Sequence, residues 1–228
     1  MTKSDKKEFV FQKLSQLLIP QGYYLVKTGL DPRFVLKEKE KVIFFILNFN
    51  DSGSIVMSKT MISILIVEEI MIEIKKPNQD YSFLDDKKYF LDTLLDKNTS
   101  IEGKYDNGSI NHNVNDKEQL DYFTKSIITY IETEGQKFIE KYSYLPNVLA
   151  EMDKLQLEGK YWNELLSGGP EFLFRGLIIS KLCNDKKYEE KLSYVESLLI
   201  SMADDFLPYF EKLKIRLDDL KPKYNLKE

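Results

Sequence analysis

The chain has 228 residues, of which 43% are hydrophobic and 13% aromatic, and its formal net charge is −4. This apolar content can offset the entropy of ordering a chain, so the composition excludes intrinsic disorder and indicates one large or two small globular domains. The only arginines are Arg33, Arg175 and Arg216, whereas proteins that bind phosphate backbones usually carry a basic excess. We therefore expect no nucleic-acid partner.

The chain also lacks the sequence signals of export and membrane insertion. Its first residues, MTKSDKKEFVFQKLSQ, are too charged for a signal peptide. Its most apolar stretch is interrupted by Glu68 and Glu69 and is shorter than the ~20 apolar residues of a membrane span. Cys183 is the only cysteine, so no internal disulfide can form. These features predict a soluble cytoplasmic protein without a membrane partner.

The first predicted element is a helix over residues 4–19. Ser4 or Asp5 is expected to cap it, since either side chain can accept a hydrogen bond from a free N–H group of the first turn. Apolar residues then recur on one face, and Pro20 and Gly22 end the pattern.

Strand patterns follow the first helix. Short strands are predicted at 23–27 and 33–39, and another at 55–66. The strongest prediction is KVIFFILNFN, because both of its alternating sets of side chains are apolar. Such a strand is typical of the interior of a sheet with both faces covered, so we expect 42–49 to be buried on both sides.

The period then changes to that of a helix. Four apolar residues of VEEIMIEIKK have helical spacing: Val67, Ile70, Met71 and Ile74. Pro77 is expected to end this helix. Residues 78–109 give weaker patterns, with a short strand predicted within 88–95 and an exposed loop or hairpin at 96–109.

The second half of the chain is predicted to be helical. Asn115 and Glu118 have the spacing of a capping box, and Gly135 interrupts the helix that they begin. Just upstream lies His112, the only histidine, which we interpret as structural or exposed because no second histidine can share a metal with it. Further helices are predicted from Pro146, after the sequence LSGGP, and at 186–200 and 204–220. The helix FLFRGLIISKL is apolar almost all round, so it is expected at the centre of the C-terminal helices.

These elements predict an α+β fold. An N-terminal helix and a mostly antiparallel sheet occupy the N-terminal half, and a group of packed helices follows. We expect a helix-plus-sheet region over 1–112 and a helical region packed on it over 113–228, forming one continuous structural unit.

No standard catalytic motif occurs, so we predict no catalytic residues and no cofactor. A structural zinc requires four Cys or His ligands, and the chain has one of each, so no transition metal is expected either. Glu69 and Glu73 share a helix face at i, i+4 and could join Asp204 or Asp205 in a hard-cation site. A solvated helix face is the more common origin of such spacing.

Two residues of the C-terminal half are binding candidates. Arg175 lies in the apolar sequence FLFRGLII, where a charge needs a partner, and Glu171 stands four residues before it. The simpler interpretation is an ion pair within one helix, and the alternative is an anchor in a cleft that binds an anion or a partner's carboxylate. Trp162, the only tryptophan, is either a lid over the helical core, which we favour, or an exposed recognition aromatic.

The order of elements resembles a bacterial group of domains of unknown function. The resemblance rests on Gly22–Tyr23 after the first helix, on Val42–Ile43 with Phe45, and on Phe138 with Tyr142 and Leu145. It covers residues 5–155. Some members of such groups stand beside toxin systems, so the resemblance implies an immunity or interaction protein and brings no catalytic residues with it.

Two hypotheses about function follow. The first is a non-enzymatic protein-interaction module, immunity-like in its finer form, whose partner is another protein; acidic charge and the high Tyr and Phe content favour it. The second is a hydrolase or metal-dependent enzyme that uses scattered carboxylates. The sequence does not define the partner or the oligomeric state.

Overall fold

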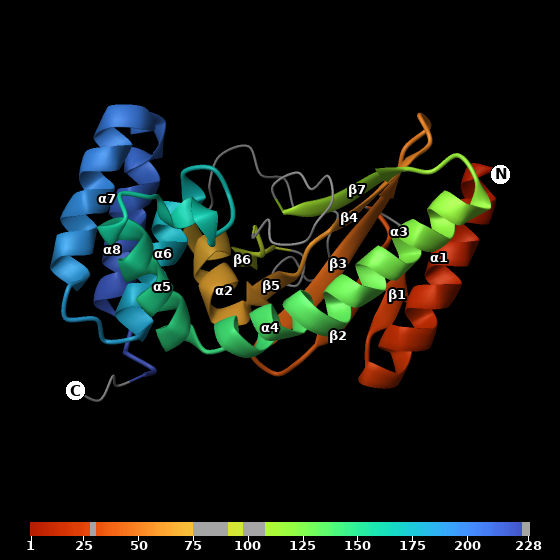
Figure 1. The fold of residues 1–228 in the computed structure, drawn as a ribbon. Helices are drawn as coiled ribbons and strands as arrows, with labels where there is room; N and C mark the ends of the chain where they lie inside the picture. The colour runs from red at the N-terminus through yellow and green to blue at the C-terminus, as the bar shows by residue number, and fades with distance from the viewer. Residues whose placement is uncertain (28–30, 75–90, 98–107, 225–228) are drawn as a thin grey trace. The chain divides into compact units, whose positions relative to one another are not determined.

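The computed structural model describes residues 1–27, 31–74, 91–97 and 108–224. They belong to two compact units: unit 1 consists of Met1–Ile62 and Leu95–Glu140, and unit 2 of Ser63–Leu94 and Lys141–Glu228. An N-terminal helix is followed by an antiparallel sheet and then by packed helices, which confirms the predicted α+β class (Figure 1). The predicted boundary between residues 112 and 113 falls inside unit 1.

Unit 1 combines two helices with an antiparallel sheet. Its elements are α1 (Lys3–Leu18), the 3-10 helix η1 (Ile19–Gln21), β1 (Tyr24–Val26), β2 (Arg33–Lys37), β3 (Lys41–Phe49), β4 (Ser54–Ser58), β7 (Ser109–Asn113), α3 (Lys117–Tyr130) and the π-helical η3 (Ile131–Gly135). Three further elements run across unit boundaries: β5 (Met61–Ile64), β6 (Leu94–Leu95) and α4 (Gln136–Tyr142). The strand order is β1-β2-β3-β4-β7, and α1 contacts α3 alongside the strands (Figure 1).

The strand β3 lies inside the sheet, as predicted, between β2 and β4. Phe44 and Phe45 point to opposite faces and both are buried. Phe45 pairs with Phe34 across β2, and the Tyr23 ring packs 5.9 Å from it. From Ile46 onward one face becomes half-buried, so both faces are fully covered only in the first half of the strand.

The single strand predicted at 55–66 is wrong. The chain forms β4, breaks at residues 59–60, and resumes as β5 before a helix begins at Leu65. At the break the Lys59 N–H donates to the Gly108 carbonyl, and the Thr60 N–H donates to the Tyr130 hydroxyl instead of to a strand. Lys59 and Thr60 at the break are polar, but apolar residues resume directly after them, so the sequence pattern was interpreted as one continuous strand.

Both helix caps in unit 1 differ from their predictions by a short shift along the chain. Thr2, rather than Ser4 or Asp5, caps α1, and Asp5 completes a capping box with it. The cap of α3 is Asp116, whose carboxylate accepts from the Gln119 N–H at 2.8 Å. Several neighbouring residues can serve as caps, so composition alone does not select one.

A buried polar cluster joins the break after β4 to the end of α3. The Tyr130 hydroxyl accepts from the Thr60 N–H at 2.8 Å and donates to the Asp96 carboxylate at 2.7 Å. Here the helix widens into the π-helical η3, where a Cβ on Gly135 would lie 3.0 Å from Thr60 Oγ1. Glycine therefore allows the helix to approach this polar turn, which explains the interruption seen in the sequence.

Tyr130→Phe is expected to destabilise the protein by about 1–3 kcal/mol, because it leaves the buried Thr60 N–H and the Asp96 carboxylate without this partner. Thermal unfolding followed by circular dichroism, together with faster exchange of the Thr60 amide, measures the loss. The matched control is Tyr122→Phe on the same helix, whose side chain is exposed and whose change should stay within about 0.5 kcal/mol. Equal effects of the two substitutions would contradict the structural role of Tyr130.

His112 lies on β7, with ring centroids 5.5 Å from Tyr122 and 5.7 Å from Phe123. Burial lowers its pKa below the ordinary value for histidine. Its ring is thus part of an aromatic packing between β7 and α3.

Unit 2 is a group of helices around one central helix. Its elements are α2 (Leu65–Ile74), α5 (Leu145–Leu157), the 3-10 helix η4 (Trp162–Glu164), α6 (Glu171–Leu182), α7 (Tyr188–Met202), the 3-10 helix η5 (Asp204–Phe206) and α8 (Leu207–Asp218). The helix α6 is buried over its whole first three turns and contacts α2, α5, α7 and α8. This confirms the prediction for FLFRGLIISKL. The predicted helix end at Pro77 lies outside the described residues, as does most of the predicted loop at 96–109.

No helix in the described ranges is both long enough and apolar enough to cross a membrane.

The Cys183 thiol should react slowly with iodoacetamide in the native protein, because it is buried after α6 and burial raises its pKa to about 12. Mass spectrometry of timed samples measures the rate, and the same reaction in denaturant gives the accessible reference. Rapid stoichiometric labelling of the native protein would contradict this expectation.

Candidate functional site

Unit 2 contains a buried ion pair between α2 and α6. Arg175 Nε donates to Glu68 Oε1 and Arg175 Nη2 donates to Glu68 Oε2, both at 2.8 Å. Glu68 is fully buried, and Arg175 is 6% exposed. This two-point geometry matches the planar guanidinium to both carboxylate oxygens, which is the strongest form of such a pair.

Backbone and hydroxyl groups complete the hydrogen bonding around the pair. Thr93 Oγ1 donates to Glu68 Oε1 at 2.7 Å and accepts from the Ile64 N–H at 2.8 Å. Arg175 Nη1 donates to the Ser167 carbonyl at 2.9 Å. The next residue, Gly168, has φ +94°, and a Cβ there would lie 2.8 Å from Arg175 Nη1. The sequence SGGP therefore lets the chain pass close to the guanidinium.

Two more carboxyl groups face this arginine. Glu171 is buried on the first turn of α6, and Asp92 precedes Thr93. Both interact electrostatically with Arg175. Burial raises the pKa of Asp92 above its ordinary value, against the opposing effect of the Arg175 charge. Despite its burial, Arg175 has a raised pKa because of Glu68, so it stays protonated.

The predicted partner of Arg175 needs correction. Glu171 lies near it, as its i−4 position implies, but the guanidinium donates hydrogen bonds to Glu68 and Ser167. In the sequence, Glu68 was noted only because it and Glu69 interrupt the most apolar stretch. A signal was present, since Glu68 stands three residues after Leu65 and three before Met71, on the apolar face of its helix.

Trp162 is fully buried, so it is not an exposed recognition aromatic. Its ring lies against Gly176 of α6, where a Cβ would stand 2.4 Å from Trp162 Cε3. On the other side the Tyr194 ring lies 5.5 Å away. Trp162 thus covers the central helix, as the lid interpretation predicts, and its side chain is shielded from solvent.

Glu69 and Glu73 lie on the exposed face of α2. Glu73 Oε2 accepts from Arg216 Nε of α8 at 2.6 Å, so this carboxylate ties two helices together. Among the residues that the structure describes, no group of three or more His, Cys, Asp or Glu side chains is arranged to hold a metal ion.

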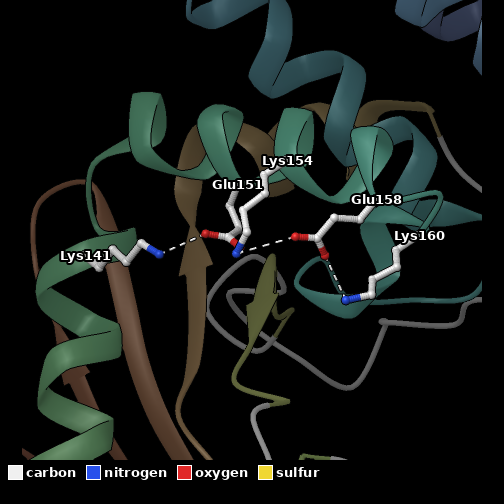
Figure 2. A network of polar contacts seen from close by, with 5 residues as sticks. All are labelled: Lys141, Glu151, Lys154, Glu158 and Lys160. Atoms are coloured by element: carbon white, nitrogen blue, oxygen red, sulfur yellow. Dashed lines mark hydrogen bonds and ion pairs between the residues drawn. The ribbon is translucent and has the colours of Figure 1, made fainter.

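A ladder of alternating charges runs along the surface of α5 (Figure 2). Glu151 accepts from Lys141 at 2.8 Å and from Lys154 at 3.2 Å. Lys154 lies 3.9 Å from Glu158, which pairs with Lys160 at 2.8 Å. Each exposed pair contributes little to stability. Together they present a fixed sequence of positive and negative groups that ends at the C-terminus of α5.

Apolar side chains are exposed at this same end of α5. Leu157 is 85% exposed and Tyr161 is 44% exposed. Between them the helix ends in a Schellman turn: the Lys160 N–H donates to the Leu155 carbonyl, and Gly159 has φ +69°. A hollow of about 170 Å³ adjoins Leu157, and its lining includes Asp153 of α5 and Glu190 of α7. We call Leu157, Tyr161 and this hollow the α5 end surface.

A larger and more open hollow, of about 570 Å³, lies where α6 and α8 end. Its charged lining includes three lysines and four carboxylates: Lys181, Lys186, Lys221, Asp185, Glu189, Asp218 and Asp219. Asp185 accepts from Lys191 at 2.6 Å and from Ser180 at 2.7 Å. Although burial opposes them, these bonds lower the pKa of Asp185 below its usual range. Its carboxylate is therefore ionised and already bonded to Lys191 and Ser180 within the fold.

No protein-family model, curated protein or solved structure matches this chain.

Proposed function

We propose that this protein is a non-enzymatic protein-interaction module and that it binds its partner through the α5 end surface. The observation that carries the proposal is the 85% exposure of Leu157 beside a hollow lined by residues of α5 and α7. Scattered exposed leucines are common. Leu157 differs from such isolated leucines because it is accompanied by the exposed aromatic Tyr161, a hollow and a polar rim.

The chemistry of this surface suits a protein partner. Covering Leu157 and Tyr161 would remove apolar area from water, which favours association. Tyr161 can contribute both a ring and a hydroxyl, a combination enriched at interfaces. Trp162 lies buried directly after Tyr161, so the surface is presented by packed structure and little conformational entropy is lost on binding.

The charge ladder supplies the polar rim of the proposed interface. Lys154, Glu158 and Lys160 form a row of alternating charges that leads to the C-terminal end of α5 (Figure 2). Such a rim selects a partner of complementary pattern and adds little affinity by itself. The immunity-like role is the finer part of this proposal; it rests on the resemblance described above.

The proposal is tested by affinity capture from the source cells, followed by binding measurements with the purified candidate. Wild-type protein should capture a partner that Leu157→Asp/Tyr161→Ala does not, with at least a tenfold weaker Kd for the variant. The matched control is Ile215→Asp on α8, which places a charge on another exposed apolar residue, 70% exposed, of unit 2. Equal binding by all three proteins would refute the proposed surface.

The alternative of a carboxylate-dependent hydrolase would use the larger hollow at the ends of α6 and α8, where Asp218 and Asp219 are both exposed. It predicts that Mg²⁺ raises the melting temperature and that Asp218→Asn/Asp219→Asn abolishes this rise. Melting curves with Mg²⁺ and with EDTA that coincide for the wild-type protein would count against it.

A further inference from the structure

The hollow of the α5 end surface is lined by two helices of unit 2. Its lining consists of Asp153, Gln156 and Leu157 from α5 and of Lys187, Glu190 and Lys191 from α7. Its volume of about 170 Å³ is below the ~300–1,000 Å³ that is usual for small-molecule sites. A hollow of this size is better suited to one protruding side chain of a protein partner.

Lys191 is the most buried residue of this lining, and its charge is already paired. The residue is 1% exposed, and its ammonium lies 2.5 Å from Asp153 Oδ1 and 2.6 Å from Asp185 Oδ2. One cation is thus shared between two carboxylates, which leaves this group with a net negative charge. Because both partners of the ammonium belong to the same chain, Lys191 is not free to bind a carboxylate from outside.

Glu190 adds another negative charge to the hollow. Its side chain is exposed, and within the part of the chain that the structure describes its carboxylate forms no ion pair. Asp153 remains 33% exposed at its side chain in spite of the pair with Lys191. Lys187 is the second lysine of the lining, and it is exposed. Three carboxylates, with Asp185 included, therefore stand against two lysines.

Leu157 gives the hollow an apolar wall beside these acidic groups. Lysine and arginine side chains combine an aliphatic stem with a cationic head, and they commonly bury the stem on apolar surface. A basic side chain whose stem packs on Leu157 can direct its head to Asp153 and Glu190. The net charge of −4 of the whole chain also favours encounter with a basic partner.

We propose that the hollow beside Leu157 receives a lysine or arginine side chain of a protein partner. The stem packs on Leu157, and the cationic head pairs with the carboxylates of Asp153 and Glu190. This inference rests on the proposed function, because it names the partner chemistry of the α5 end surface. The apolar contact contributes affinity, and the carboxylates select the charge of the side chain that enters.

The first test needs no identified partner, because short blocked peptides serve as probes. They are rich in alanine and carry lysine, norleucine or glutamate at the centre, and norleucine reproduces the lysine stem without its ammonium. The full chain, with isotope-labelled leucine methyl groups, is titrated with each peptide at low salt and followed by NMR. The lysine peptide should shift the Leu157 methyl signals about threefold more than either of the others at the same millimolar concentration.

Three results of this titration would overturn the inference. They are the absence of a shift with the lysine peptide, equal shifts with the lysine and norleucine peptides, and a larger shift with the glutamate peptide. Shifts of the Leu157 signals that depend on protein concentration without any peptide would identify a second copy of this chain as the occupant, and they would overturn it as well.

Charge reversal on α7 locates the preference. Glu190→Lys should abolish the difference between the lysine and norleucine peptides. The matched control is Glu189→Lys, since Glu189 is also exposed in the first turn of α7 but lines the other hollow, at the ends of α6 and α8. It should retain the difference. A preference that survives Glu190→Lys, or that both variants lose equally, would contradict the assigned role of Glu190.

A partner found by affinity capture separates this inference from the proposed function. Glu190→Lys should weaken its Kd about fivefold, and exchange of the partner's basic residue for glutamate should restore the binding of Glu190→Lys. If Leu157→Asp/Tyr161→Ala loses the partner while Glu190→Lys binds it as tightly as the wild type, the proposed function stands and the inference is overturned. If that double variant binds the partner normally while the lysine peptide shifts Leu157 as expected, the charge preference is supported and the proposed interface is refuted.

Discussion

Arg175→Met is expected to destabilise unit 2 by about 3–5 kcal/mol, because it leaves the fully buried Glu68 carboxylate without its cation. A loss of this size is a large fraction of the total stability of a domain. Urea unfolding followed by Trp162 fluorescence measures it. A loss below about 1 kcal/mol would mean that water reaches Glu68.

Two control variants separate the buried pair from helix packing in general. Arg216→Met breaks the pair with Glu73, whose side chains are both substantially exposed, and should cost no more than about 1 kcal/mol. The double variant Glu68→Leu/Arg175→Met removes both charges and should recover much of the loss, because two apolar groups leave no buried charge unpaired. If the double variant were less stable than Arg175→Met, the pair would not be the cause of the effect.

Gly176→Ala is expected to destabilise the protein by about 1–3 kcal/mol, although alanine ordinarily favours a helix more than glycine does. The added methyl would lie 2.4 Å from Trp162 Cε3 and 3.0 Å from Met152 Cε. The helix α6 cannot withdraw, because α2, α5, α7 and α8 all contact it. Thermal unfolding followed by circular dichroism measures the cost without depending on the tryptophan.

The second substitution that tests this packing is Trp162→Ala. Alone it should cost about 3–5 kcal/mol through the cavity that it leaves. In that background Gly176→Ala should become neutral or stabilising by up to about 1 kcal/mol, since the clash is gone and the helix propensity remains. Additive costs in the double variant would show that the two residues do not meet.

Prediction from sequence succeeded where a local period determines the element. Phe44 and Phe45 on β3, and the all-round apolar helix α6, are buried because their neighbours in sequence already have the pattern of a fully covered strand or helix. It failed at residues 59–60, where hydrogen bonds to Tyr130 and Gly108 interrupt the strand that was predicted to be continuous. Partners so distant in sequence leave no local pattern.

For the candidate site, the sequence identified Arg175, Glu171 and Trp162 as unusual, but it did not identify their contacts. A buried arginine in an apolar helix requires a counter-charge, and that requirement follows from its surroundings alone. The identity of the counter-charge depends on which helix packs against α6, so Glu171 was predicted and Glu68 of α2 is found. The exposure of Leu157 likewise depends on how α5 ends and what packs beside it.

The amino-acid sequence by itself determines the α+β class and the strongly periodic elements such as β3 and α6, with the faces that they bury, because these depend on residue spacing within one element. Only the tertiary structure decides which elements belong together. The helix α2, between strands in sequence, packs with α6 and α8 in unit 2, whereas α3, which follows the last strand, packs with α1 in unit 1. An apolar helix face can be buried against any surface of matching shape, and the choice between them is made by the packing of the whole chain.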